Sequence, residues 1–157
     1  MGITQHLAKH LREAFLGGNW TWSNLRDNLK DVTLAEATQP IEGFNSIATL
    51  TFHIQYYLDV QIAVLSGQGL HGSDKEAFTH PPFGKDQDWA KFLENIWRKV
   101  EQLADLIETL PDAQLDAYFV EQKYGTWFRN LAGLIEHTHY HMGQIVILKK
   151  LIRQQAG

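Results

Sequence analysis

Residues 136–144 read Glu136-His137-Thr138-His139-Tyr140-His141-Met142-Gly143-Gln144, inside a periodic apolar stretch, 131–151, that predicts one long helix. Each helical residue advances by about 100°, so His137 and His141, four positions apart, share one face. That face is otherwise apolar, whereas His139 points to the opposite side, where we expect solvent. Two histidines on an apolar face predict either half of a metal site or a pair of hydrogen-bonded core residues.

The composition limits the class of protein. The chain has 157 residues, of which 44% are hydrophobic and 20% charged, and this fits one globular domain over residues 1–157. No apolar run approaches the roughly 20 residues of a membrane span, and the first residues lack a signal-peptide pattern. Without cysteine there is no disulfide and no thiolate ligand, and we expect a cytoplasmic protein. A net charge of -4 with scattered basic residues argues against nucleic-acid binding.

Helical periodicity continues along the rest of the chain. Helices are predicted at residues 4–16, 21–29, 46–65, about 86–110 and about 126–153. Asn45 and Thr126 are suitable N-caps for the third and the last of these helices. No strand-like alternation occurs, so the pattern predicts an all-α four-helix bundle with a short extra helix.

Two connections and the aromatic residues complete the expected fold. The connection at 66–85 is rich in glycine and proline, and connections of this length are usually functional or mobile. A second, partly ordered connection is expected at 112–124. We expect the tryptophans to lie in the core; they are Trp20, Trp22, Trp89, Trp97 and Trp127.

A third histidine, His53, lies on the apolar side of the helix predicted at 46–65. Helical bundles build metal sites from inward-facing side chains on different helices. Three histidine ligands leave coordination positions open, as catalytic sites do. A hydrogen-bonded core histidine is the alternative for His53. Gln144, one turn beyond His141, can hold a ligand histidine or a water from behind.

The remaining histidines are weaker candidates. His6 and His10 form a second pair four positions apart, but charged neighbours favour a surface or rim position. His71 and His80 lie in the connection at 66–85, where we expect exposed side chains. A loop histidine that reaches over the metal as an acid or base is the alternative for these two.

The residues Leu50-Thr51-Phe52-His53 and the H-x-x-x-H-x-G-Q segment from His137 to Gln144 resemble the pattern of the DinB-like superfamily. The resemblance spans essentially the whole chain. It implies a four-helix bundle, often a homodimer, in which His53, His137 and His141 bind a divalent ion, commonly nickel or zinc. Characterised members join low-molecular-weight thiols, such as bacillithiol or mycothiol, to electrophiles. The insertion Gly17-Gly18-Asn19-Trp20 marks this chain as a divergent branch.

Three functions remain open at this point. The first is a metal-dependent thiol transferase or hydrolase acting on a small molecule, because coordination lowers the pKa of a bound thiol or water. The second is a noncatalytic stress protein that binds a metal or a small ligand, and the third is a purely structural bundle. A substrate-sized cavity beside the histidines favours the enzyme. We expect no acidic ligand, because Glu136 points sideways and Asp59 lies off the His53 side.

Overall fold

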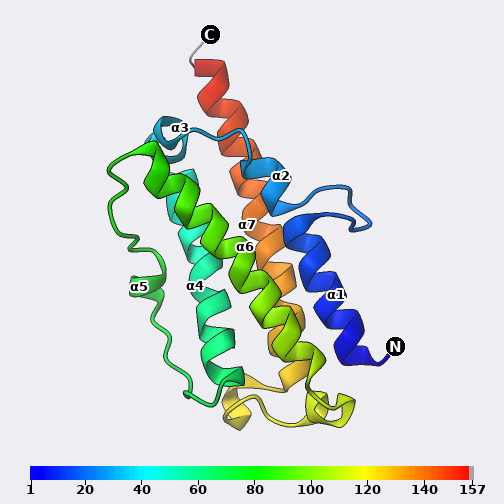
Figure 1. The fold of residues 1–157 in the computed structure, drawn as a ribbon. Helices are drawn as coiled ribbons and strands as arrows, with labels where there is room; N and C mark the ends of the chain where they lie inside the picture. Colours follow the sequence, from blue (N-terminus) through cyan, green and yellow to red (C-terminus); the bar gives the residue numbers. More distant parts are fainter. Residues whose placement is uncertain (156–157) are drawn as a thin grey trace.

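The computed structural model describes residues 1–155, and four long helices carry most of them. They are α1 (Ile3–Leu16), α4 (Ile47–Leu65), α6 (Asp86–Glu108) and α7 (Trp127–Gln155). Helices α1 and α4 each pack against both α6 and α7 (Figure 1). Residues 1–155 contain no β-strand, so the prediction of an all-α fold is confirmed.

Short elements fill the connections between the long helices. Helices α2 (Leu25–Leu29) and α3 (Leu34–Thr38) separate α1 from α4, and α5 (Asp74–Ala77) is the one turn of α-helix between α4 and α6. Two 3₁₀ turns, Asp112–Asp116 and Gln122–Tyr124, lie before α7. None of the helices within residues 1–155 combines the length and hydropathy needed to cross a bilayer.

Side-chain caps fix where the long helices begin. The Thr126 hydroxyl accepts the N–H of Arg129 at 3.2 Å at the start of α7, as predicted. For α4 the cap is Ser46, whose hydroxyl accepts the N–H of Thr49 at 3.1 Å, so the prediction of Asn45 is wrong by one residue. Helix α1 is capped by a residue far away in the sequence, because the carboxylate of Asp112 accepts the N–H groups of Ile3 and Thr4.

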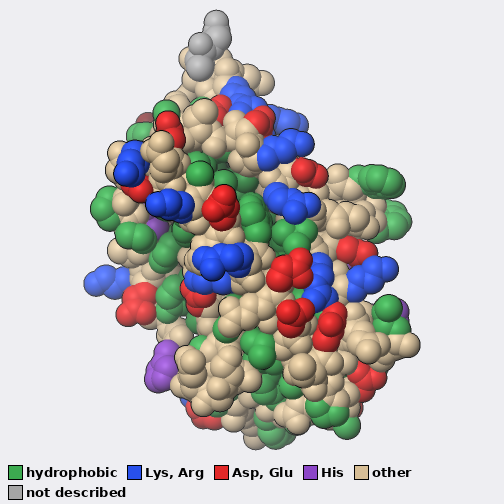
Figure 2. Space-filling view, viewed as in Figure 1, with side chains coloured by type: hydrophobic (Ala, Val, Ile, Leu, Met, Phe, Trp, Pro, Cys, Tyr) green, Lys and Arg blue, Asp and Glu red, His purple; other side chains and the backbone are tan. Residues whose placement is uncertain are grey.

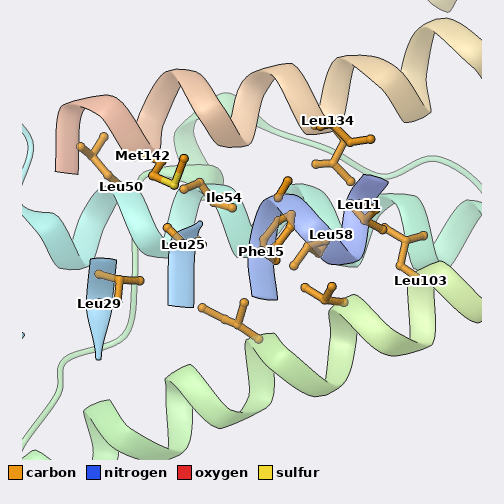
Figure 3. Packing of buried hydrophobic residues seen from close by; sticks show 14 of the residues in the cluster. Leu11, Phe15, Leu25, Leu29, Leu50, Ile54, Leu58, Leu103, Leu134 and Met142 are labelled. Atoms are coloured by element: carbon orange, nitrogen blue, oxygen red, sulfur yellow. The ribbon is translucent and has the colours of Figure 1, made fainter. Parts of the chain in front are cut away.

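The core lies where the long helices meet, and each of them contributes buried apolar side chains. Figure 3 shows Leu11 and Phe15 of α1 beside residues of the other helices. Leu58 of α4, Leu103 of α6 and Leu134 of α7 belong to the same cluster. This packing fixes the separation between α4 and α7, and therefore the distance between His53 on α4 and His137 and His141 on α7.

The prediction that every tryptophan lies in the core is wrong for Trp20 and Trp22, which are each 93% exposed. Residues 21–24 are not helical, and Trp22 adopts a positive φ of 54°. The cause is local: Asn24 caps α2 by accepting the N–H of Asp27, so that helix begins only at Leu25. The segment before the cap presents the side chains of Trp20 and Trp22 to solvent, whereas Trp89 and Trp127 are buried as predicted.

Ion pairs join the elements at the surface. On the face in Figure 2, basic and acidic side chains are interspersed, and Arg12 of α1 pairs with Glu101, Asp105 and Glu108 of α6. At the end of α7, Lys149 and Arg153 bind Asp31, and Arg153 also binds Glu36. Hydrogen bonds from Lys149 and Arg153 lower the pKa of Asp31 to about 2, and those from Arg153 and the Thr33 backbone lower the pKa of Glu36 to about 2.

The Arg153 cluster predicts an acid-sensitive contribution to stability. In an unfolded chain both carboxyl groups have a pKa of about 4, so their stabilisation is complete above that pH and is lost as pH falls through about 2. We expect Arg153→Met to lower the free energy of unfolding at pH 7 by about 0.5–1 kcal/mol, because solvent reaches all three groups and screens their ion pairs. Denaturant titrations between pH 2 and 7 measure this difference, which should vanish near pH 2. Lys150→Met is the control; an equal loss there would contradict the assignment.

Two tryptophan variants test the exposed loop. Trp89 is 3% exposed and its indole N–H donates to the Val32 carbonyl at 3.0 Å, so Trp89→Ala should cost about 3–5 kcal/mol of unfolding free energy. Trp22→Ala should change it by less than about 0.5 kcal/mol, because an exposed side chain loses little packing. Urea unfolding of the two variants measures both values. A large loss in Trp22→Ala would mean that the Trp22 side chain is packed in solution.

Candidate metal centre

Three histidines meet where α4 packs on α7. His53 comes from α4, and His137 and His141 come from successive turns of α7. One ring nitrogen of each lies within 4.8 Å of the other two. Nε2 of His137 is 2.9 Å from Nε2 of His53, and the His53 and His141 ring centroids are 4.7 Å apart. The structure therefore brings together all three histidines that the sequence singled out.

Burial favours the neutral form of His53 and His137. His53 and His141 are 5% and 8% exposed, and His137 is half-buried. Burial and the proximity of His141 and His53 lower the pKa of His137 to about 4. Burial, followed by His141, also lowers the pKa of His53, with smaller opposing effects from the Ala77 backbone and Asp74. Neutral rings carry the lone pairs that metal ligation requires.

Gln144 fixes the orientation of one ring. Its side-chain Oε1 lies 2.7 Å from Nδ1 of His141. A carbonyl oxygen only accepts hydrogen bonds, so the His141 proton is on Nδ1 and its lone pair is on Nε2. The glutamine thus lies behind His141, where the sequence placed it.

The donor set fits a divalent ion. Nε2 of His53 and Nε2 of His137 lie 2.9 Å apart, and one ring nitrogen of each of the three histidines lies within 4.8 Å of the others. Buried nitrogen lone pairs that face one another without a partner are costly. An ion bonded to one lone pair of each ring would satisfy them, and tetrahedral zinc would separate its ligand nitrogens by about 3.3 Å, a value inside the range present.

A pocket of about 660 Å³ opens beside the histidines. All three histidines contribute to its wall. Residues of α4, of α7 and of residues 74–78, which we call the α5 segment, also contribute. Among them are Tyr57, Gln61, Asp74, Phe78, Arg129 and Glu136. Small-molecule sites in proteins usually enclose about 300–1,000 Å³, so this pocket is large enough for a substrate.

The α5 segment covers the site from one side. The Phe78 ring stacks on His53 with a centroid distance of 3.9 Å and an interplanar angle of 19°. The Tyr57 hydroxyl donates to Asp74 at 3.0 Å, and the Tyr56 hydroxyl donates to Glu76 at 3.1 Å. Burial, reinforced by Asp74, raises the pKa of Tyr57 to about 12, so this hydroxyl stays protonated.

Sequence reasoning missed most of these pocket residues. For Tyr57 a signal existed, because it lies one helical turn after His53 on the same face. For Asp74 and Phe78 there was none, because both reach the site from an irregular connection. Acidic groups line the pocket at Asp74 and Glu136. Within residues 1–155, however, no carboxylate oxygen joins the three nitrogens within 4.8 Å.

The other histidines lie outside this cluster. His6, His10 and His71 are exposed, as predicted. His80 is half-buried beside Phe83, with Nδ1 at 2.8 Å from the Pro81 carbonyl, and does not line the pocket.

His139 points away from the cluster, as its helical phase predicts, but it does not lie free in solvent. The side chain is half-buried, Nδ1 donates to the Ile135 carbonyl at 3.0 Å, and Nε2 accepts the Asn19 amide at 3.3 Å. The expectation of a solvent-facing ring is therefore wrong. The glycine-containing loop after α1 returns to α7 and covers this side of the helix.

Comparison with known proteins assigns the family. The model of the DinB superfamily matches residues 19–145, a segment that includes His53, His137, His141 and Gln144. Curated proteins and solved structures gave no significant match. The family match covers most of the chain, from the loop before α2 to the middle of α7. The chain belongs to the DinB superfamily.

Proposed function

We propose that His53, His137 and His141 bind a divalent metal ion, nickel or zinc, and that the protein is a metal-dependent enzyme acting on a small molecule. One observation carries the proposal: three histidine ring nitrogens converge in the wall of a pocket of about 660 Å³. A noncatalytic metal-binding protein needs no substrate-sized space beside its ion, so the pocket favours the enzyme over that alternative.

The residues around the histidines have separable roles in this proposal. A divalent ion would lower the pKa of a thiol or water bound to it, and the deprotonated thiol or water would be a nucleophile at neutral pH. Gln144 holds the His141 proton on Nδ1, which leaves Nε2 free for ligation. Phe78 covers one face of His53 and excludes water there. The Tyr57 hydroxyl donates to Asp74, so its oxygen can accept a hydrogen bond from substrate.

Thiol transfer is the reaction that we place first. Three neutral ligands leave the charge of a divalent ion uncompensated, and a thiolate balances it while acting as nucleophile. In such a transfer the thiol loses its proton to solvent, the sulfur forms a bond to an electrophilic carbon, and the bond from that carbon to its leaving group breaks, so that the leaving group departs with the electron pair. The family resemblance supports this order, and hydrolysis of a small molecule by the same site is the second candidate.

We also propose that the four long helices form a four-helix bundle of the DinB-like type, as one domain over residues 1–157. The packing of α1 and α4 against both α6 and α7 supports the bundle. A cytoplasmic homodimer is the assembly that we expect, and for the dimer the support is the family resemblance alone.

Two histidine variants test the ligand assignment. We expect His141→Ala to lose most of the bound metal, because it removes one of three ligands together with its Gln144 contact. His139→Ala, two positions away on the opposite side, should keep a full equivalent. Elemental analysis of the purified variants after loading with nickel or zinc measures both. Equal loss in the two variants would refute the assignment.

Thiol binding tests the reaction class. Small thiols added to the cobalt-substituted protein should shift its visible absorption, because sulfur becomes a ligand of the ion. His137→Ala and protein treated with a chelator should show no such shift. If thiols leave the wild-type cobalt spectrum unchanged while metal is retained, thiol transfer fails and hydrolysis becomes the leading reaction.

A further inference from the structure

The pocket continues well beyond the three histidines. On α7, Arg129, Gly133 and His137 follow one another at intervals of four residues, and all three line the pocket. The corresponding series on α4 is His53, Tyr57 and Gln61. Eight helical residues span about 12 Å, so the pocket is an elongated groove between α4 and α7 with the histidines towards one end.

The floor of this groove between its two ends is open. A Cβ atom placed on Gly133 would meet no other atom within 4 Å. Gly133 lies midway between Arg129 and His137, so no side chain of its own separates them. An extended molecule can therefore lie along α7 from the histidines to Arg129.

Arg129 brings a positive charge to the end remote from His141. One guanidinium nitrogen donates to the Tyr124 carbonyl at 2.9 Å. Within residues 1–155 no carboxylate lies within 4.0 Å of this guanidinium, whereas Arg12 and Arg153 each bind more than one. The other donors of Arg129 are free of protein carboxylates and can bind an anion.

The acidic residues of the pocket belong to the histidine end. Asp74 accepts the Tyr57 hydroxyl, one turn from His53, and Glu136 precedes His137 on α7. Neither neutralises Arg129. The remote end is also polar in other respects, because the buried Gln61 side chain lines it and its Oε1 has no hydrogen-bond partner in residues 1–155.

We propose that Arg129 binds the carboxylate of the substrate, and that the substrate is a small elongated thiol whose sulfur and carboxylate are on the order of 10–15 Å apart. This inference rests on the proposed function, since it places the thiol at the three histidines. A guanidinium presents two parallel N–H donors that match the two oxygens of a carboxylate. Arg129 thereby selects the substrate by its charged end, away from the reacting atoms.

A series of synthetic thiols tests the distance and the charge together. The probes are 3-mercaptopropanoate, 8-mercaptooctanoate and 11-mercaptoundecanoate, each compared with its own carboxamide. Their dissociation constants are read from the visible spectrum of the cobalt-substituted protein. For the longer probes the acid should bind about two- to fivefold more tightly than the amide, as expected for a largely exposed ion pair. The shortest probe should show no preference, because it cannot reach Arg129.

Matched variants identify the residue responsible. Arg129→Met should abolish the preference for the acid, and Arg129→Lys should keep part of it. Arg26→Met is the control, because Arg26 is also an exposed arginine that donates to a backbone carbonyl, that of Leu16, outside the pocket. A preference that survives Arg129→Met, or equal binding of acid and amide at every length, overturns the inference and leaves thiol binding at the metal intact.

A second readout keeps the inference testable if thiol transfer fails. If no thiol changes the cobalt spectrum, octanedioate is titrated into the zinc-loaded protein. The Arg129 Nε–H resonance is then followed by NMR. A saturable shift with the dicarboxylate and none with its diamide supports carboxylate binding at Arg129. No shift with either compound overturns it. Loss of the proposed thiol chemistry is thus distinguishable from loss of the Arg129 site.

Discussion

The contact between α4 and α7 is the constraint on which the candidate site depends. It buries His53 against His137 and His141, and it sets the 2.9 Å approach of two Nε2 atoms. Apolar residues such as Ile54, beside His53 on α4, pack in the same core and hold the helices together. Ligand positions must be kept to within about 0.5 Å for metal binding, and side chains on packed helices meet that demand better than side chains on loops.

The same two helices give the pocket its direction and its charge pattern. Spacings of four residues place the histidines, Gly133 and Arg129 along one groove, because this interval returns to nearly the same helix face. A divalent ion held by neutral ligands would add positive charge at one end. Arg129 supplies positive charge at the other end, where no carboxylate of residues 1–155 forms an ion pair with it. The groove therefore favours a ligand with anionic groups at both ends over an apolar one.

Helical periodicity was sufficient to predict the four long helices, the face that His137 and His141 share, and the position of His53 on the apolar side of its own helix. All three depend on local spacing, which the sequence carries directly. What periodicity could not predict depends on the path of the connections. Trp22 is exposed and His139 is half-buried because the loop after α1 returns towards α7, and Phe78 reaches His53 from the α5 segment. Neither path follows from the pattern of any one helix.

The two sides of the site differ in how firmly they are held in the fold, and this difference bears on how a substrate enters the pocket. The histidines are on long, well-packed helices, whereas α5 has only four residues and cannot be stable by its own backbone hydrogen bonds. It is held in place by hydrogen bonds from the Tyr56 and Tyr57 hydroxyls to the carboxylates of Glu76 and Asp74. The stacking of Phe78 on His53 adds to these contacts. Each such hydrogen bond contributes about 1 kcal/mol, so displacing α5 costs about 2–4 kcal/mol, far less than separating α4 from α7. The pocket can thus widen at α5 for substrates of different size while the three ring nitrogens keep their positions.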